Sequence, residues 1–322
     1  MRVSLVITVL NESSSITSLL RSLKKQAKRA DEIIIVDGGS IDQTVSLIDE
    51  YANKHKKLNI RVIQEHGNIS HGRNTGVKNA AGPVIVMIDG GCTAKKDWLK
   101  KITEPFTDNK HIVVAGFYTM KTVTAWQKAV SAFYGTSLRK LDLRCFLPSA
   151  RSIAFHKSVW EKVGGFDERL NRAGEDTLFN YQVLRYDIPI IRRPDALVVW
   201  NVTDDLLSSA KKFFSYAKGD AQTGIWWHPS KRFATHNVKI LTIYMRYAVF
   251  AFLFLVSPVA PFSFFLLNWL FVTYLFWSMW KLKDEVTGLP ALLMLPVVQL
   301  VSDISIMAGF LSGLLQKSQK AV

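Results

Sequence analysis

Two aspartates each end an apolar run and precede a pair of glycines, at 37–40 and at 89–91. A carboxylate beside a glycine turn leaves open space in which a flat ring can approach the backbone. The oxygens of Asp37 suit the N–H of a nucleobase or a ribose hydroxyl, and those of Asp89 suit ribose or a divalent metal. An ordinary turn aspartate is the competing interpretation of Asp37.

Three further charged side chains stand near the starts of predicted helices. Arg73 lies within the run 72–76, where backbone N–H groups favour an anion and the guanidinium adds a fork of donors. Glu175 and Asp176 follow a glycine, and two adjacent carboxylates at the lip of a cleft can divide the work of removing a proton and orienting an acceptor. The structural alternatives are an exposed salt bridge for Arg73 and a helix-dipole interaction for the two acids.

Alternating strand and helix patterns predict the elements that position these groups. The predicted strands span 3–9, 32–36, 60–64, 84–88 and 112–116, and the predicted helices span 14–26, 42–51, 71–80 and 97–106. This alternation predicts an α/β fold with a mostly parallel sheet covered on both faces. Ligands bind outside the carboxyl ends of such strands, so 8–12, 37–40 and 89–93 should converge. Ser40 and Gln43 have capping-box spacing, which predicts a helix start just after Gly39.

The last third of the chain is apolar, with stretches at 240–256, 262–280 and 289–315 that approach the roughly 20 residues needed to cross a membrane. Asp303 lies in the third stretch, where a charge is costly without a partner. Arg246 is a candidate partner, and a segment lying in the interface is the alternative. A buried helical core of a soluble protein is the alternative for the whole region.

An amphipathic pattern over 206–217, interspersed with lysines, predicts a helix lying flat on a bilayer or packed on the domain core. The expected domains are therefore a catalytic domain over 1–203, an interfacial segment over 204–236 and a membrane domain over 237–322.

The composition agrees with a membrane-associated protein. A formal net charge of +15 accompanies 48% hydrophobic residues, a pairing that suits an anionic membrane surface. The Lys and Arg residues are dispersed and form no nucleic-acid reader motif, so no nucleic-acid partner is expected. Two isolated cysteines exclude a disulfide framework. The apolar start is interrupted at residues 11–12 and is interpreted as a buried strand, which predicts that the first domain stays in the cytosol.

The order of the motifs resembles glycosyltransferase family 2, which has a GT-A fold. The matching elements are the opening 6–12, Asp37 with Gly38, Gly39 and Ser40, the run 73–76, Asp89, the run 164–167, and Glu175 with Asp176. The resemblance covers about residues 1–200. It implies transfer of a sugar from a nucleotide-sugar donor, with a UDP-sugar expected.

The resemblance also implies roles for single residues. The implied donor-binding residues are Thr8, Asn11, Glu12, Asp37, Gly39, Ser40, Arg73, Asp89, Gly90 and Lys218. Asp176 is implied as the general base of an inverting displacement, with Glu175 and Arg151 on the acceptor side. Lys218 enters through the run 216–220, which resembles a segment of bacterial exopolysaccharide-assembling relatives.

Two departures from the family pattern affect the expected chemistry. Gly91 replaces the last aspartate of the usual D-x-D triplet, so binding of Mg²⁺ or Mn²⁺ would depend on Asp89, and Arg73, Arg151 and Lys218 are candidates to share the leaving-group charge. The Q-x-x-R-W motif of processive members is absent from the sequence. We therefore expect single-sugar transfer to a lipid-linked saccharide at the cytoplasmic membrane face. The alternatives are transfer to polyprenyl phosphate and a catalytically silent nucleotide-sugar-binding scaffold.

Overall fold

The computed structural model describes residues 1–107, 111–135, 137–170, 173–202, 204–227 and 235–319. The chain divides into two compact units. The first comprises residues 1–121 and 142–201, and the second comprises residues 122–141 and 202–322. The sequence-based division at 203 and 236 stays a prediction, and residues 228–234 of its interfacial segment lie outside the described residues.

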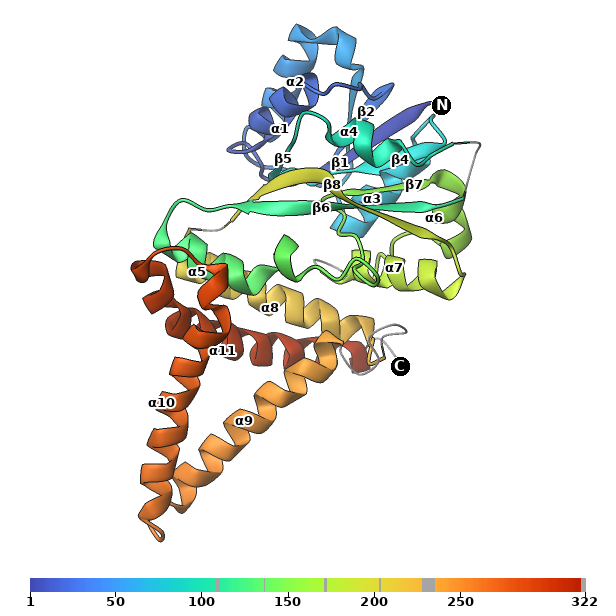
Figure 1. Cartoon of the computed structure of the whole chain (residues 1–322). Coiled ribbons are helices and arrows are strands. Elements are labelled where there is room, and N and C mark those ends of the chain that lie inside the picture. Colours follow the sequence, from blue (N-terminus) through green and yellow to red (C-terminus); the bar gives the residue numbers. More distant parts are fainter. Residues whose placement is uncertain (108–110, 136, 171–172, 203, 228–234, 320–322) are drawn as a thin grey trace. The chain divides into compact units, whose positions relative to one another are not determined.

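The first unit is built on one eight-stranded sheet (Figure 1). Its strands are β1 (Val3–Val9), β2 (Glu32–Asp37), β3 (Ile60–Gln64), β4 (Val84–Met87), β5 (Cys92–Ala94), β6 (Val113–Lys121), β7 (Ile153–His156) and β8 (Ile190–Asn201), in the spatial order β3-β2-β1-β4-β7-β6-β8-β5. Strands β3, β2, β1 and β4 run parallel, and β7 pairs antiparallel with both β4 and β6. The predicted α/β class and mostly parallel sheet are confirmed.

Helices cover both faces of this sheet (Figure 1). One face carries α1 (Ile16–Lys24), α2 (Thr44–Lys54) and α4 (Trp98–Thr103), and the other carries α3 (Ile69–Lys78), α6 (Lys157–Val163) and α7 (Glu175–Arg185). The short η1 (Lys56–Leu58) precedes β3. The central strands β1, β2 and β4 read as apolar runs because both of their faces are buried.

Helix α3 lies unusually close to the sheet because of two glycines. A Cβ on Gly76 would collide with Val6, and a Cβ on Gly72 would lie 3.1 Å from Thr8. Gly72 and Gly76 are one helical turn apart and therefore face β1 together. This close packing fixes the position of Arg73, which follows the first of these glycines.

The start of α2 corrects one sequence prediction. The helix begins at Thr44, and its N-cap residue, Gln43, makes no side-chain capping bond. The hydroxyl of Ser40 instead donates to Asp37 at 2.5 Å. The predicted capping box at Ser40 is therefore wrong, because the hydroxyl is used inside the turn that follows β2.

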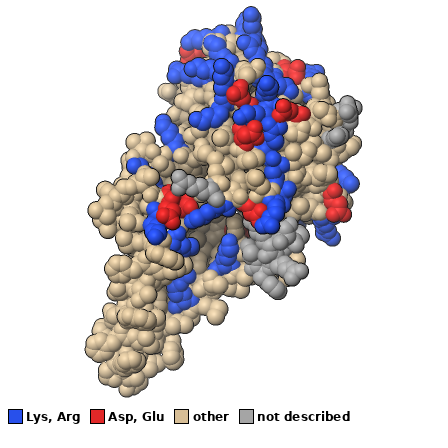
Figure 2. All heavy atoms as spheres, in the orientation of Figure 1, with Lys and Arg blue, Asp and Glu red and all other residues tan. Residues whose placement is uncertain are grey.

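The regular elements in the described part of the second unit are all helices. It contains α5 (Ala125–Tyr134), η2 (Leu138–Lys140), α8 (Leu206–Thr223), α9 (His236–Val256), α10 (Phe262–Leu282), η3 (Lys283–Glu285) and α11 (Leu289–Gln319). Helices α9, α10 and α11 are each long and apolar enough to cross a membrane. The chain carries no charged residue between Tyr247 and Trp280, and Figure 2 shows the hairpin end as an uncharged surface.

Helices α8 and α11 pack with their backbones in close contact. A Cβ on Gly309 or on Gly313 would collide with the backbone of α8. Phe213 of α8 is buried and its ring centroid lies 4.9 Å from that of Tyr134 on α5. The amphipathic helix predicted over 206–217 thus buries one side within the helical unit, and its contact with a bilayer stays a prediction.

A polar cluster joins the three apolar helices. Arg246 of α9 donates to Asp303 of α11 at 3.2 Å, and Tyr274 of α10 donates to the same carboxylate. Asp303 is almost fully buried. The predicted pairing of Arg246 with Asp303 is confirmed, and the pair reduces the cost of placing a carboxylate among apolar helices.

Candidate active site

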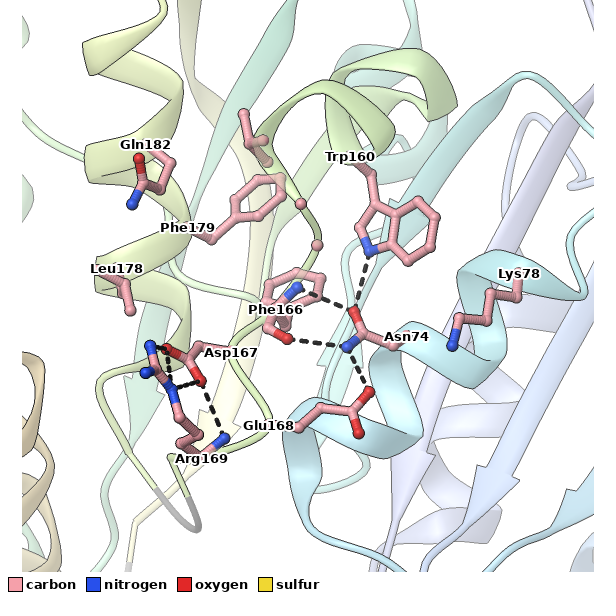
Figure 3. Close-up of a pocket in the computed structure, with 13 residues that line it drawn as sticks. Asn74, Lys78, Trp160, Phe166, Asp167, Glu168, Arg169, Leu178, Phe179 and Gln182 are labelled. Carbon is pink, nitrogen blue, oxygen red and sulfur yellow. Dashed lines mark hydrogen bonds and ion pairs between the residues drawn. The ribbon is translucent and has the colours of Figure 1, made fainter. Parts of the chain in front are cut away.

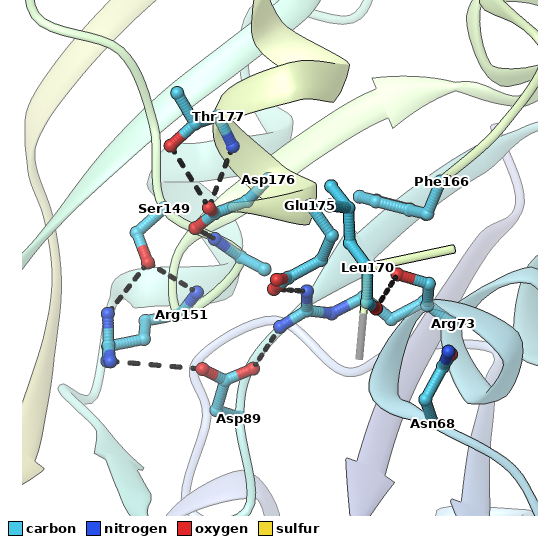
Figure 4. Close-up of polar contacts among 12 residues, drawn as sticks. Asn68, Arg73, Asp89, Ser149, Arg151, Phe166, Leu170, Glu175, Asp176 and Thr177 are labelled. Carbon is cyan, nitrogen blue, oxygen red and sulfur yellow. Dashed lines mark hydrogen bonds and ion pairs between the residues drawn. The ribbon is translucent and has the colours of Figure 1, made fainter. Parts of the chain in front are cut away.

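Arg73 is the centre of the charged cluster in the first unit. Its side chain is 4% exposed and forms ion pairs with Glu175 and, at 3.0 Å, with Asp89 (Figure 4). The guanidinium also lies 5.6 Å from the ring centroid of Phe166. The three charged residues come from α3, from the start of α7 and from the segment after β4. Sequence segments about 100 residues apart therefore meet at Arg73, although their mutual pairing was not predicted.

Burial and charge act in opposite directions within this cluster. Burial disfavours the cation of Arg73, but the carboxylates around it, Glu175 foremost, outweigh that effect and raise its pKa above the usual value. Burial raises the pKa of Glu175, and the charge of Arg73 opposes that rise. Oxygen Oε2 of Glu175 is buried and accepts no hydrogen bond from a described residue. The charged form of Glu175 therefore depends on its ion pair with Arg73.

Asp89 lies between two arginines. Its Oδ1 accepts from Arg73, and its Oδ2 lies 3.9 Å from Nε of Arg151 (Figure 4). The guanidinium carbon of Arg151 lies 4.2 Å from the ring centroid of Trp200 and 5.1 Å from that of Tyr118. The two rings hold the arginine in one orientation. Its side chain is 17% exposed, although Nε is buried.

Asp176 lies at the first turn of α7 and is partly exposed. One oxygen accepts from the backbone N–H of Thr177 at 2.7 Å, and the other accepts from the N–H of Ala150 at 3.3 Å. The second bond ties α7 to the segment that leads to Arg151 (Figure 4). The Thr177 hydroxyl adds a longer contact at 3.5 Å. A carboxylate retains a further acceptor site after these three bonds, so Asp176 can still receive a proton from a bound hydroxyl.

The turn after β2 places Asp37 at a separate part of the same sheet edge. Its carboxylate accepts from the N–H groups of Gly39 and Ser40 at 3.1 and 3.0 Å, besides the Ser40 hydroxyl. Gly39 has a φ of +103° and its backbone lies against the ring of His66, so a side chain there would collide with that ring. These three bonds are those expected of an ordinary turn aspartate. They leave one acceptor position on the Asp37 carboxylate for the N–H of a nucleobase.

The loop after β1 connects the two ends of this edge. The backbone N–H of Asn11 donates to Ser40 at 2.8 Å, and that of Glu12 donates to Thr44 at 2.7 Å. The carboxylate of Glu12 reaches the other way, to Gly90 and Gly91. Since β1 separates β2 from β4, Asp37 and Asp89 are about 10 Å apart across two strand spacings. A nucleotide bound at both would have to extend along the edge past β1.

Asn74 holds the loop that leads to the acidic pair. Its Oδ1 accepts from Trp160 and from the backbone of Phe166 at 3.0 and 2.9 Å, and its Nδ2 donates to the carbonyl of Phe166 and to Glu168 at 2.8 and 2.7 Å (Figure 3). These contacts border a hollow formed largely by residues 163–169. The hollow lacks Asp37, Arg73, Asp89 and Asp176, so it supports the loop and is separate from the charged cluster.

Replacement of Asn74 by alanine should destabilise the protein by about 3 kcal/mol, because it leaves several buried donors and acceptors of the loop unpaired. Thermal unfolding of the purified full-length variant measures the change. Asn79→Ala is a matched control, since Asn79 is the exposed C-cap residue of the same helix and its side chain makes one bond, to the Thr75 carbonyl at 3.0 Å. Equal stability of Asn74→Ala and Asn79→Ala would contradict the structural role of Asn74.

Comparisons with known proteins identify the family. The model of glycosyl transferase family 2 matches residues 4–164, which is half of the chain. The chain belongs to this family. It is 30% identical over 177 residues to the glycosyltransferase AglE of Haloferax volcanii, covering 54% of this chain and 58% of AglE. It is 27% identical over 194 residues to the uncharacterised glycosyltransferase EpsJ of Bacillus subtilis, covering 57% of this chain and 56% of EpsJ. The matches thus span less than two thirds of either relative.

The fold of this family 2 chain is similar to that of a mannosyltransferase, PcManGT of Pyrobaculum calidifontis, solved with GDP-Man and Mn²⁺. The TM-score is 0.62 at 16% identity, and the alignment covers 98% of this chain and 88% of that one. This likeness establishes the GT-A fold. The predicted family, fold class and C-terminal apolar helices are therefore confirmed.

The metal expected for the family can be tested against the residues present. In the described ranges no group of three or more His, Cys, Asp or Glu side chains converges. Both carboxylate oxygens of Glu12, however, lie 3.8 Å from the point that a Cβ at Gly91 would occupy. Glu12 therefore lies where the missing motif aspartate would project. Mg²⁺ commonly uses one or two protein carboxylates with substrate phosphates, so Asp89 and Glu12 fit an ion held largely by the donor.

The roles of Thr8, Gly90 and Lys218 in donor binding stay predictions. Thr8 packs against Gly72 of α3 at the end of β1, and Gly90 allows the close approach of Glu12, whose Cγ lies 3.1 Å from its Cβ position. Lys218 lies on α8 of the second unit, and its proposed contact with the diphosphate is untested. Sequence reasoning missed Asn74 as a loop anchor and missed His66 beside Gly39. The family motif contains that asparagine, but only coordinates reveal its four bonds.

Proposed function

We propose that this family 2 protein transfers one sugar from a nucleotide-sugar donor, expected to be a UDP-sugar, to a lipid-linked saccharide. The observation that carries the proposal is the meeting of Arg73, Asp89, Glu175 and Asp176 at one edge of a GT-A sheet. The donor would lie with its base near Asp37 and its diphosphate beside Asp89. In open α/β sheets, ligands bind at this edge.

The reaction proposed is a single displacement with inversion at the anomeric carbon. Asp176 accepts the proton of the acceptor hydroxyl, and that oxygen forms its bond to the anomeric carbon while the bond to the diphosphate oxygen breaks. The partly exposed carboxylate of Asp176 supports this role, because a base must be reachable by the acceptor. Glu175 is buried with Arg73 and acts as a positioning residue, which revises its expected contact with the acceptor.

The departing diphosphate needs positive charge beside it. Arg151 supplies a guanidinium that Trp200 and Tyr118 hold in place, and a preorganised cation stabilises developing charge without reorganisation. Arg151 therefore serves the donor side in this proposal as well as the acceptor side. A divalent ion, when bound by Asp89 and Glu12, would neutralise part of the same charge.

The acceptor is proposed to be membrane-borne. Three helices of sufficient length and apolarity support attachment to the cytoplasmic membrane, with the family 2 domain in the cytosol. Attachment places the enzyme on the surface where lipid-linked saccharides reside. The experiment is transfer of labelled sugar by the purified full-length protein in lipid vesicles, with a panel of UDP-, GDP- and dTDP-sugars. A labelled lipid product supports the proposal, and donor binding without transfer or hydrolysis would favour the silent scaffold.

Introduction of the missing motif carboxylate should change the metal requirement. Gly91 does not have a positive φ, and a Cβ there would make only ordinary contacts, 3.8 Å from the Glu12 oxygens, so Gly91→Asp is tolerated sterically. A third carboxylate beside Asp89 and Glu12 should lower the Mn²⁺ concentration for half-maximal activity about tenfold, since cation affinity rises with ligand charge. Titration of transfer with Mn²⁺ measures this shift, and Gly91→Asn is the uncharged control. An unchanged titration for Gly91→Asp would argue against a metal position at residue 91.

A further inference from the structure

Four cationic side chains gather at one end of the α9–α10 hairpin. Lys239 lies in the first turn of α9 and Lys281 in the last turn of α10, so the antiparallel hairpin brings both to the same end. Lys281 is repelled by the charges of Arg246, Lys239 and Lys140 of η2, and it is attracted by that of Asp303. Segments about 140 residues apart in the sequence thus bring positive charge to one place in the helical unit.

The carboxylates of this region compensate only part of that charge. Lys140 pairs with Glu285 at 2.8 Å, and Arg246 pairs with Asp303 at 3.2 Å. Lys239 and Lys281 form no ion pair with any carboxylate of the described residues. Asp303 attracts Lys281 but is already paired with Arg246, so the repulsion between the two lysines is only partly offset, and an anion bound between them would be stabilised.

Aromatic side chains border the same end of the hairpin. The ammonium of Lys281 lies 4.7 Å from the ring centroid of Trp277, and Arg246 lies 4.2 Å from that of Tyr274. Trp and Tyr prefer the level of lipid headgroups. Beyond them, from Tyr247 to Trp280, the hairpin carries no charge. Cations at the headgroup level next to an apolar surface match a molecule with a phosphate head and a hydrocarbon tail.

The arrangement differs from that of lysines that merely flank a membrane span. Lys283 also lies near the end of α10, but its ammonium extends over Trp280 at 6.0 Å. Lys211 is exposed on α8. Lys211 and Lys283 can contribute to a general attraction between the protein and an anionic membrane surface. Lys239 and Lys281 differ because they come from two helices and lie at the same end of the hairpin.

We propose that Lys239 and Lys281, supported by Arg246 and Lys140, bind the phosphate or diphosphate of a polyprenyl lipid. Arg246 lies about 10 Å further along α9 than Lys239. Its contacts with Asp303 and Tyr274 hold it in place, so it forms the inner end of the site. The lipid tail follows the uncharged hairpin into the membrane. The identification of this lipid as the sugar acceptor rests on the proposed function, but the binding itself does not require transfer.

Direct binding to the full-length protein tests the site. The protein is placed in phosphatidylcholine nanodiscs, and the affinity for a short-chain fluorescent polyprenyl phosphate is measured without any nucleotide sugar. Lys239→Ala/Lys281→Ala should weaken binding at least tenfold. The control Lys211→Ala/Lys283→Ala removes the same net charge and should change binding less than twofold. Thermal unfolding of each variant verifies the folded state.

The outcomes separate the possible occupants. Equal weakening by the two double variants would mean general surface attraction and would overturn the site. Competition by phosphatidylglycerol as strong as by unlabelled polyprenyl phosphate would assign the lysines to bulk anionic lipid and overturn the polyprenyl assignment. If inorganic phosphate competes as strongly as unlabelled polyprenyl phosphate at the same concentration, the hydrocarbon tail contributes nothing to binding. That result would contradict the proposal. Polyprenyl phosphate binding in a protein that transfers no sugar would uphold the site and refute only the proposed function.

Discussion

Asp176→Asn should lower sugar transfer about a thousandfold while leaving donor affinity unchanged, because the variant keeps an oxygen acceptor and loses the base. Asparagine can still accept from Thr177 or Ala150, so the local structure should persist. Single-turnover transfer and separate titration of donor binding measure the two quantities. The control is Asp187→Asn, since Asp187 is exposed beyond the same helix and has a φ of +52°, which asparagine adopts readily.

The result of Asp176→Asn also distinguishes between acceptors. A saccharide hydroxyl must lose a proton during attack, whereas a phosphate oxygen is already ionised and needs no base. Full activity of Asp176→Asn would therefore contradict the base assignment and favour direct transfer to polyprenyl phosphate. Loss of both transfer and donor binding would indicate a structural role for the carboxylate instead.

Arg73→Met should destabilise the protein by about 3–5 kcal/mol, because it leaves the buried carboxylate of Glu175 without its partner. Unfolding by denaturant measures the loss. The double variant Arg73→Met/Glu175→Met should recover most of it, since removal of both charges leaves no unpaired ion in the interior. Failure of the second substitution to restore stability would show that Glu175 is not the source of the loss.

The instability of Arg73→Met should depend on pH. Without the arginine, burial raises the pKa of Glu175 and the main opposing interaction is lost. The folded state then holds a proton that the unfolded state releases, so stability falls as pH rises from the ordinary glutamate range through the raised pKa. The variant should therefore be more stable at pH 5 than at pH 8, relative to wild type. A pH-independent difference would contradict burial of an unpaired carboxylate.

The sequence predicted the sheet edge well because strand order and glycine turns follow from local patterns. Buried strands read as apolar runs, and Asp37 and Asp89 stand where those runs end. The three apolar helices were equally predictable, because their length and their lack of charge can be read directly from the sequence. These features depend on residues that are neighbours in the sequence.

Side-chain pairings across long separations were not predictable in the same way. Glu175 was assigned to the acceptor, but Arg73 lies 102 residues earlier and binds it in the interior. Ser40 had capping-box spacing, yet its hydroxyl binds Asp37 because the turn places that carboxylate closer. The approach of Glu12 to Gly91 depends on how the loops after β1 and β4 meet. Only the folded chain decides between such competing partners.

Binding of a sugar nucleotide at this sheet edge is the central claim, and thermal unfolding with a panel of sugar nucleotides tests it most directly. At 100 times its dissociation constant, the matching donor should raise the Tm by about 5 °C or more. Asp89→Ala should reduce that shift because it removes the proposed ribose or metal contact. If no UDP-, GDP- or dTDP-sugar changes the Tm at millimolar concentration, or if Asp89→Ala leaves the shift intact, the assignment of this edge as the donor site is wrong.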